Sequence, residues 1–356
     1  MQDPRIPVYV VTGFLGAGKT TLLRRALKDP RLSGSLLLVN EVAELGVDDR
    51  LMRLDGTEAV LLANGCLCCA ASEGLSQTLQ KIVESEAAPA ISRVIVETTG
   101  LADPLPVIST IAIHPFLSAR LRVEMVVTIV DSMHAVESEG SADYARQIQS
   151  ADVVLLSKTD LATPAQVDAT TGVVRRHNPL CAVHRVCDAD FADLVTCMSS
   201  EHRADRLATG LFSTILDGAA PAERTRLRIG QRFAPSSVHT SSVQTFCLEL
   251  GDDLDWLRLS VWLSLMLHRH GANVLRIKGF LALENRDAPV VVNCVRHVIY
   301  FPEHLDAWPD GDRRSFLVFI VKDLMPDAVL RSFLACVRRP ASIGLSTSRT
   351  AVPAIA

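Results

Sequence analysis

The sequence predicts an α/β fold in which a parallel-sheet domain is followed by a second, smaller α+β domain. Short apolar runs alternate with helix-like segments over the first half of the chain, which is typical of parallel strands joined by helices. The length of 356 residues also exceeds the roughly 100–200 residues of one domain. We expect the first domain at residues 1–197, a linker at 198–242, the second domain at 243–339 and a flexible tail at 340–356.

A glycine-rich turn near the N-terminus organises the first domain. An apolar run at residues 6–11 reads as a buried strand, and Gly13, Gly18, Lys19 and Thr20 follow it with the spacing G-x4-G-K-T of a P-loop. Glycines let backbone N–H groups converge on one point, and the next helix adds the positive end of its dipole. Lys19 can then reach the outer phosphates while the Thr20 hydroxyl binds Mg²⁺. The turn therefore predicts a nucleoside triphosphate site in a P-loop NTPase domain.

The composition argues against nucleic acid and membrane partners. The formal net charge is -4, and no apolar run reaches the roughly 18 residues of a membrane span. The first apolar run leads into the P-loop and is therefore not expected to be a signal peptide. Nine cysteines in a nucleotide-binding chain indicate reduced thiols, and hence a cytoplasmic location.

An acidic segment follows the second apolar run, at residues 36–39. It opens with Asn40 and Glu41, at the carboxyl end of a predicted strand, where ligands bind in open α/β sheets. We expect a switch segment that senses phosphate and metal, with Glu41 among the Mg²⁺ ligands. The alternative is an ordinary acidic loop.

Three thiols are crowded into four positions after the apolar run at residues 59–62. Cys66, Cys68 and Cys69 can present three sulfurs to one metal ion, and Zn²⁺ accepts tetrahedral thiolate sites readily. A fourth position then stays open, which suits an ion that must enter and leave. Glu73 is one candidate for that position, or else a solvated helix residue. A buried turn or a redox pair is the alternative for the cluster.

A carboxylate ends the next apolar run. Residues 72–88 have the pattern of an amphipathic helix, and residues 94–96 then lead into Glu97, which suits a Walker-B role in holding Mg²⁺. Gly100 offers an unhindered backbone N–H to a γ-phosphate. Asp103 is expected to cap the helix that follows it.

A guanine-reading motif follows two further apolar runs, at residues 123–130 and 153–156. Ser157, Lys158 and Asp160 resemble N-K-x-D with serine in the first place. An aspartate accepts hydrogen bonds from the guanine N1–H and amino group, a donor pair that adenine lacks. The alternative is a simple helix cap. A run at residues 182–186 is expected to form the last strand of the sheet.

The second domain has the predicted order βαβββα. We expect a short helix at 208–216 within the linker, and a helix whose buried face carries Leu254, Leu257, Val261 and Leu265. His268 and His270 either complement the dipole at the end of that helix or bind metal. The remaining elements are strands around residues 246–250, 273–283, 290–299 and 315–321 and a helix at 327–337.

Together these motifs resemble the CobW-like GTPases, which belong to the same broad class as the nickel-insertion GTPases. The resemblance extends over residues 6–337 and is carried by GFLGAGKTTLL at 13–23, Asn40-Glu41, GCLCC at 65–69, ETTGLADP at 97–104, SKTDL at 157–161, VLRIKG at 274–279 and the stretch from Trp308 to Phe319-Ile320. Two departures stand out. The family usually reads N-E-F-G-E in the switch, where this chain has Val42-Ala43, and this chain lacks a histidine-rich tract.

The resemblance implies a GTP-hydrolysing metallochaperone that binds Zn²⁺, or alternatively Co²⁺, and transfers it to a client metalloprotein. We assign catalysis to Lys19, Thr20 and Glu97, magnesium to Thr20, Glu41 and Glu97, and the transition metal to Cys66, Cys68 and Cys69. The expected nucleotide contacts are Gly13, Gly16, Ala17, Gly18, Lys19, Thr20, Thr21, Gly100, Ser157, Lys158 and Asp160.

Three alternatives stay open. One is a GTPase that activates a specific metalloenzyme, of the cobalt/cobalamin or nitrile hydratase type. Another is a P-loop small-molecule kinase, and the third is a binding protein in which GTP only locks a conformation. The sequence also leaves a homo-oligomer open.

Overall fold

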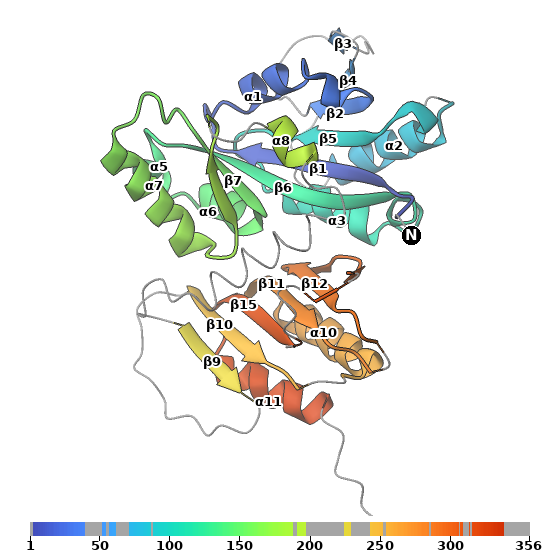
Figure 1. Ribbon diagram of the computed structural model, residues 1–356, viewed down its shortest axis with the longest axis vertical. Helices are drawn as coiled ribbons and strands as arrows, with labels where there is room; N and C mark the ends of the chain where they lie inside the picture. Colours follow the sequence, from blue (N-terminus) through green and yellow to red (C-terminus); the bar gives the residue numbers. More distant parts are fainter. Residues whose placement is uncertain are drawn as a thin grey trace, which may run out of the picture.

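The computed structural model of the chain contains two β-sheets, which Figure 1 shows one above the other. The described residues are 3–39, 52–54, 57–61, 71–86, 88–187, 191–196, 224–228, 243–251, 254–284, 286–305, 307–308, 313 and 315–337. Among them, no helix has the length and apolar character needed to cross a membrane.

The first sheet has eight strands in the order β3-β4-β2-β5-β1-β6-β7-β8. Every pairing in it is parallel except that of β3 with β4, so the predicted α/β domain is confirmed. The hairpin to β3 was not predicted. The strands are β1 (Ile6–Gly13), β2 (Ser35–Val39), β3 (Met52–Leu54), β4 (Thr57–Leu61), β5 (Arg93–Glu97), β6 (Leu121–Asp131), β7 (Val153–Ser157) and β8 (Ala182–Arg185).

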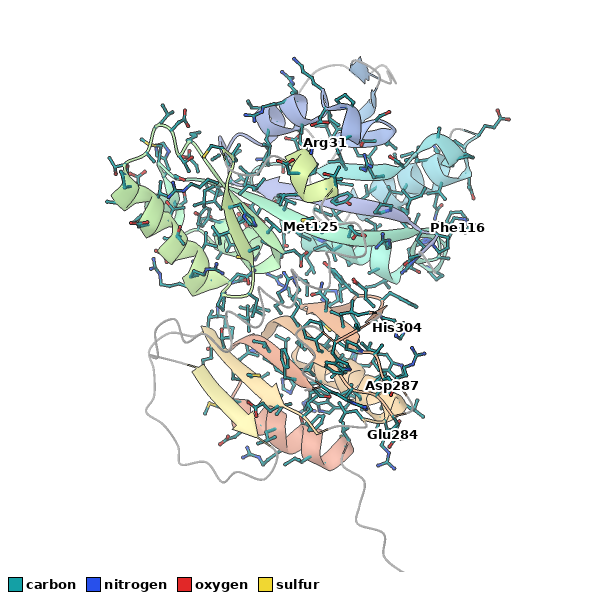
Figure 2. The ribbon with its side chains drawn as sticks, in the orientation of Figure 1. Arg31, Phe116, Met125, Glu284, Asp287 and His304 are labelled. Carbon is teal, nitrogen blue, oxygen red and sulfur yellow. The ribbon has the colours of Figure 1, made fainter. Side chains whose placement is uncertain are left out.

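Helices cover both faces of this sheet. Side chains of α1 and α8 pack on one face around Met125, which lies inside the domain in Figure 2. Helices α2, α3, α4, α6 and α7 pack on the other face. Between the strands lie α1 (Lys19–Ala26), η1 (Pro30–Leu32), α2 (Ala71–Glu84), η2 (Ala88–Ala90), α3 (Leu105–Ile113), α4 (Pro115–Ser118), α5 (Ala135–Ser138), α6 (Ala142–Ser150), α7 (Pro164–His177) and α8 (Phe191–Thr196).

The second sheet has the order β13-β12-β11-β15-β10-β9, with β14 paired to β12. It is antiparallel except where β9 joins β10. Its elements are β9 (Arg224–Arg228), β10 (Val243–Glu249), α10 (Trp256–His270), β11 (Val274–Leu281), β12 (Val290–Val295), β13 (Val298–Ile299), β14 (Glu303–His304), β15 (Phe316–Lys322) and α11 (Pro326–Cys336).

Two expectations for this region are wrong. The segment expected to be a linker contributes β9, which extends the sheet by a strand. The strand expected at residues 290–299 is divided in two, because Arg296 adopts a left-handed conformation with φ 51° and turns the chain back on itself. The expected helix at 208–216 and tail at 340–356 lie outside the described residues.

Helix α10 buries a different face from the one expected. Leu254 is buried, but Leu257, Val261 and Leu265 are 70%, 50% and 60% exposed. The helix carries a second apolar stripe, and that stripe packs against the sheet through Trp262, whose ring contacts Phe319 and Phe333 edge-on. A period of 3.6 residues fits both stripes, and packing of the bulky indole selects between them.

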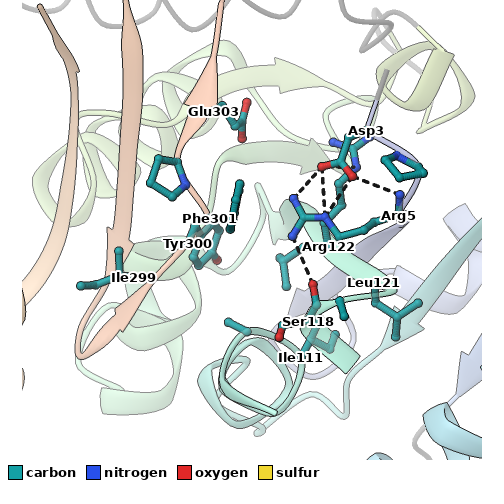
Figure 3. Close-up of a pocket in the computed structure, with 15 residues that line it drawn as sticks. Asp3, Arg5, Ile111, Ser118, Leu121, Arg122, Ile299, Tyr300, Phe301 and Glu303 are labelled. Carbon is teal, nitrogen blue, oxygen red and sulfur yellow. Dashed lines mark hydrogen bonds and ion pairs between the residues drawn. The ribbon is translucent and has the colours of Figure 1, made fainter. Parts of the chain in front are cut away.

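The two sheets meet where α6 contacts β11 and α3 contacts β13 (Figure 1). Val295, Val298 and Tyr300 from the second sheet belong to the same apolar cluster as α3. A cavity of about 710 Å³ lies beside this junction (Figure 3). Arg5 and Leu121, at the starts of β1 and β6, line it. It is therefore at the opposite end of these parallel strands from the P-loop.

Candidate nucleotide-binding site

The P-loop follows β1, the strand in the middle of the parallel sheet. Gly13 has φ 146° and lies so close to β6 that an added Cβ would be 2.3 Å from the Ile129 carbonyl oxygen, so only glycine fits there. Gly16 and Gly18 also have positive φ, at 70° and 93°, and a Cβ on either would meet nothing within 4 Å. The loop is thus a cradle that opens onto free space, as a phosphate site requires.

The Lys19 side chain folds back onto this loop. Its Nζ donates to the carbonyl oxygens of Gly13, at 2.7 Å, and of Phe14, at 3.1 Å. Burial lowers the pKa of Lys19, and the charge of Glu97 opposes that shift. The two carbonyls hold the ammonium where outer phosphate oxygens can replace them.

Thr20 and Glu97 meet beside the lysine. Thr20 Oγ1 donates to Glu97 Oε1 at 2.7 Å, and Glu97, at the end of β5, is only 4% exposed. The next residue, Thr98, is fixed against β1 through a 2.8 Å bond from its hydroxyl to that of Thr12. A hydroxyl and a buried carboxylate at hydrogen-bond distance are hard oxygen donors, and this set fits Mg²⁺. The sequence predicted both residues, and the structure brings them together.

The predicted guanine motif follows β7, two strands from β1. Ser157 Oγ donates to the Ala17 carbonyl oxygen at 2.7 Å, which ties this loop directly to the P-loop. Lys158 has φ 55°, and its Nζ donates to Asp131 Oδ2 at 2.6 Å. Asp160 is exposed at the tip of the turn. The serine in the first place of the motif therefore serves as a link between the two loops.

Asp131, at the end of β6, has an environment that favours its ionised form. Burial alone would raise the pKa of Asp131, but hydrogen bonds from Lys158, the Met133 N–H and His134 outweigh it and lower the pKa. A permanent negative charge thus keeps Lys158 in place.

Gly100 packs against the P-loop. A Cβ on Gly100 would lie 2.8 Å from the Leu15 Cα, so the turn after Glu97 and the P-loop touch backbone to backbone. Gln147, which the sequence analysis did not single out, donates to the carbonyl oxygens of Gly100 and Ala102. The sequence gives no signal for it, because its two partners lie 45 and 47 residues away along the chain.

Several predicted site residues are not described. Glu41, Cys66, Cys68 and Cys69 lie outside the described residues, and the same holds for the side chain of Glu73. Within the described part of the chain, no group of three or more His, Cys, Asp or Glu side chains could hold a metal ion, so His268 and His270 form no such cluster there.

The parallel sheet, the cradle and the Lys19–Thr20–Glu97 group define a P-loop nucleotide-binding protein. The chain belongs to the CobW family: the family model "CobW/HypB/UreG, nucleotide-binding domain" matches residues 7–185, and "Cobalamin synthesis protein cobW C-terminal domain" matches residues 243–337. The suspected resemblance is thereby confirmed.

Similar proteins span the whole chain. Zinc chaperone YjiA of Escherichia coli (strain K12) is 29% identical over 337 residues, covering 94% of this chain and 99% of that protein. Zinc chaperone CobW of a Sinorhizobium species is 28% identical over 359 residues, covering 92% and 96%. The crystal structure of Zn(II)-bound YjiA GTPase from E. coli superimposes with a TM-score of 0.60 at 26% identity, covering 95% of this chain and all of that one (100%).

A third relative matches only in part. Zinc-regulated GTPase metalloprotein activator 1 of Schizosaccharomyces pombe is 32% identical over 190 residues, which cover 51% of this chain and 45% of that protein.

Proposed function

We propose that this protein is a GTP-hydrolysing metallochaperone that carries zinc to a client metalloprotein. The observation that carries the proposal is the whole-length likeness to proteins named zinc chaperones, together with an assembled P-loop site. The similarity to the crystal structure of a zinc-bound GTPase supports the hydrolytic part. We assign the nucleotide domain to residues 1–197 and the C-terminal domain to 243–339, with β9 as an added strand of its sheet.

The residues around the P-loop have separate roles in this proposal. Backbone N–H groups from Gly13 to Thr21 bind the phosphates, Lys19 neutralises their charge, and Gly100 responds to the γ-phosphate. Asp160, exposed in the loop that Ser157 ties to the P-loop, reads guanine, and the aliphatic stem of Lys158 supports the base. No described side chain near the site stands out as a general base, which suits catalysis by positioning and slow turnover.

Thr20 and Glu97 would hold Mg²⁺, with Glu41 as a further ligand. The bound ion neutralises charge that develops on the phosphate oxygens. The chain's own contribution is the fixed arrangement of a hydroxyl and a buried carboxylate 2.7 Å apart.

Cys66, Cys68 and Cys69 would bind the transported metal as thiolates, zinc first and cobalt as the alternative. The segment that carries them begins after β4 and ends before α2. Since β4, β2 and β5 are parallel, β4 ends at the same edge of the sheet as Glu97. The chain therefore leaves the sheet towards the cysteines at the edge that carries Glu97, and we propose that a change at the phosphates reaches the transported metal.

We further propose a cytoplasmic location, since the cluster needs reduced thiols. The relative named a metalloprotein activator favours the variant in which one specific metalloenzyme is the client. A homo-oligomer stays open in either case.

Single-turnover hydrolysis of GTP, with and without zinc, tests the proposal. We expect release of inorganic phosphate at a rate that zinc changes. Bound GTP that is never hydrolysed would indicate a binding protein, and phosphate found on a small molecule would indicate a kinase. Lys19→Ala serves as the blank for contaminating phosphatases.

A further inference from the structure

Gln147 holds the turn that follows the Glu97 strand. This side chain, on α6, is 1% exposed, and its Nε2 donates to the carbonyl oxygens of Gly100, at 3.0 Å, and Ala102, at 3.1 Å. Its Oε1 is buried without a hydrogen-bond partner among the described residues. The amide therefore acts as a donor only, and one rotation of it would break both bonds.

The other side of the same turn is closed by the P-loop. A Cβ on Gly100 would meet the Leu15 side chain at 2.5 Å and its Cα at 2.8 Å, so the turn cannot move towards the nucleotide loop without displacing it. The backbone of Gly100 is thus fixed between Leu15 and Gln147. Small errors of position matter here, because a displacement of about 1 Å can cost up to about 100-fold in rate.

The second sheet contacts the C-terminal end of α6, within one turn of Gln147. Arg276 on β11 is fully buried, and its Nη1 donates to the carbonyl oxygens of Ser150, at 2.8 Å, and Ala151, at 2.7 Å. These carbonyls belong to the last residue of α6 and to its C-cap residue, so the helix itself cannot satisfy them. Arg276 and Lys278 also pair with Asp152, the next residue along the chain.

A second contact reaches the turn from its other end. Asp103 lies directly after the Gly100–Ala102 stretch, and its Oδ2 is 3.3 Å from Nη1 of Arg296, between β12 and β13. Its Oδ1 accepts from the N–H of Leu105, the first residue of α3, at 3.0 Å. The second sheet and the turn after β12 therefore contact both the C-terminal end of α6 and the residue that follows the turn.

We propose that Gln147 is a positioning residue for GTP hydrolysis, and that it transmits the docking of the second domain to the Gly100 turn. This inference rests on the proposed GTP hydrolysis. Gln147 does not touch the nucleotide; it fixes the backbone that faces the γ-phosphate. Docking through Arg276 and Arg296 sets the position of α6 and of the turn together. The C-terminal domain is thus part of the hydrolytic apparatus.

Gln147→Met in the full chain tests this role, because methionine keeps the length of the side chain and removes both donors. We expect kcat for GTP to fall at least about tenfold, within the range that misplacement costs. KM, the affinity for fluorescent GDP and the melting temperature should stay near those of the parent. The preference for a GTP analogue over GDP should shrink, because only the analogue engages Gly100.

Arg296→Gln should lower kcat in the same direction. The double variant should be no slower than Gln147→Met alone, since both act through one turn. Arg175→Met is the matched control: this arginine on α7 also donates to two carbonyls, those of Pro179 and Cys181, but makes no contact with the turn. Its turnover should equal that of the parent.

Normal turnover in Gln147→Met would overturn the inference. A fall in kcat that is accompanied by weaker GDP binding and a lower melting temperature would also overturn it. The residue would then only stabilise the fold. Additive losses in the double variant would remove the link to the second domain. If the parent chain hydrolyses GTP no faster than Lys19→Ala does, the proposed function is contradicted instead. The preference for a GTP analogue over GDP, compared between the parent and Gln147→Met, then tests whether Gln147 positions the Gly100 turn.

Discussion

Lys158 Nζ lies 2.6 Å from Asp131 Oδ2, so the lysine that follows β7 is bound by the carboxylate that ends β6. The two strands are neighbours in register, with Asp131 opposite Ser157. Asp160, two residues further along the chain, is exposed. The ion pair thus restrains Lys158 of the predicted guanine motif, and the aspartate of that motif is accessible to a ligand.

Asp160→Asn should therefore weaken GTP binding and reduce the preference for GTP over ATP. We expect a change of about 1–3 kcal/mol, the size of a lost hydrogen bond to a charged group. Titration of fluorescent GTP and ATP analogues measures both affinities. Equal affinity of the parent chain for the two nucleotides would sink the assignment of guanine to this loop.

Lys19→Ala should abolish hydrolysis and leave the fold intact. Among the described residues, the side chain hydrogen-bonds only to carbonyls of its own loop, at Gly13 and Phe14, and it is not part of the apolar core. Phosphate release and the circular dichroism melt measure the two outcomes separately. Normal turnover in a correctly folded variant would contradict the role of the P-loop.

Metal and nucleotide should be linked through the cysteine cluster. If GTP changes the affinity for zinc, zinc must change the affinity for GTP by the same factor, typically 5–150-fold for a coupling of about 1–3 kcal/mol. Thiols also lose protons when they bind zinc, so the affinity should rise with pH. Anaerobic chelator competition with a GTP analogue, with GDP and without nucleotide measures the link.

Cys68→Ser should weaken zinc binding in all three states, whereas Cys336→Ser, at an exposed cysteine on α11, should leave it unchanged. Equal zinc affinity of the parent in every nucleotide state would mean a static structural site. Unchanged affinity in Cys68→Ser would move the site elsewhere.

Asp152→Asn should destabilise the junction between the sheets by about 3–5 kcal/mol, because it leaves the buried cations Arg276 and Lys278 without their counter-ion. Asp193→Asn provides the control, since Asp193 forms an exposed pair with Arg31 and such pairs contribute only about 0–1 kcal/mol. Urea unfolding of the two variants gives the comparison. An equal fall in the free energy of unfolding in both variants would contradict a stabilising role of the buried ion pair.

Acid should weaken the same junction. Burial would raise the pKa of Asp152, but Arg276 and Lys278 outweigh it and hold the pKa below its usual value. The ionised form therefore contributes stability above the unfolded pKa near 3.9, and this contribution is lost as pH falls through the lower folded value. The pH dependence of unfolding between about 5 and 2 should be shallower in Asp152→Asn. An unchanged slope would argue against the pairing.

The residues around the P-loop could be predicted from the sequence because they depend on local chemistry. The buried face of α10 and the role of Gln147 could not, because they depend on packing between distant parts of the chain. The P-loop, Glu97 and the Ser157 motif each depend on a strand followed directly by a polar tip, so spacing along the chain was enough. On α10, two apolar stripes fit one period, and only the sheet beneath could decide that Trp262 goes inside. Gln147 donates to the carbonyls of Gly100 and Ala102, 47 and 45 residues earlier in the chain, so its role depends on the fold.

The sequence does indicate that Arg276 and Lys278 need a buried partner. They stand two positions apart in an apolar run and so share one face of a strand, where two buried cations require an anion. Nothing in the spacing indicates that the anion is Asp152, more than a hundred residues earlier.

The same three residues limit how far the two halves of this chain can be exchanged between relatives. Suppose that the C-terminal domain is joined to the nucleotide domain of a relative with no acid at the position of Asp152. The positive charges of Arg276 and Lys278 would then be buried without Asp152, and the junction between the two domains would not form, although each domain kept its own core. A recipient with that acid removes this obstacle. Asp152, Arg276 and Lys278 therefore mark the residues that a working chimaera must inherit as a set.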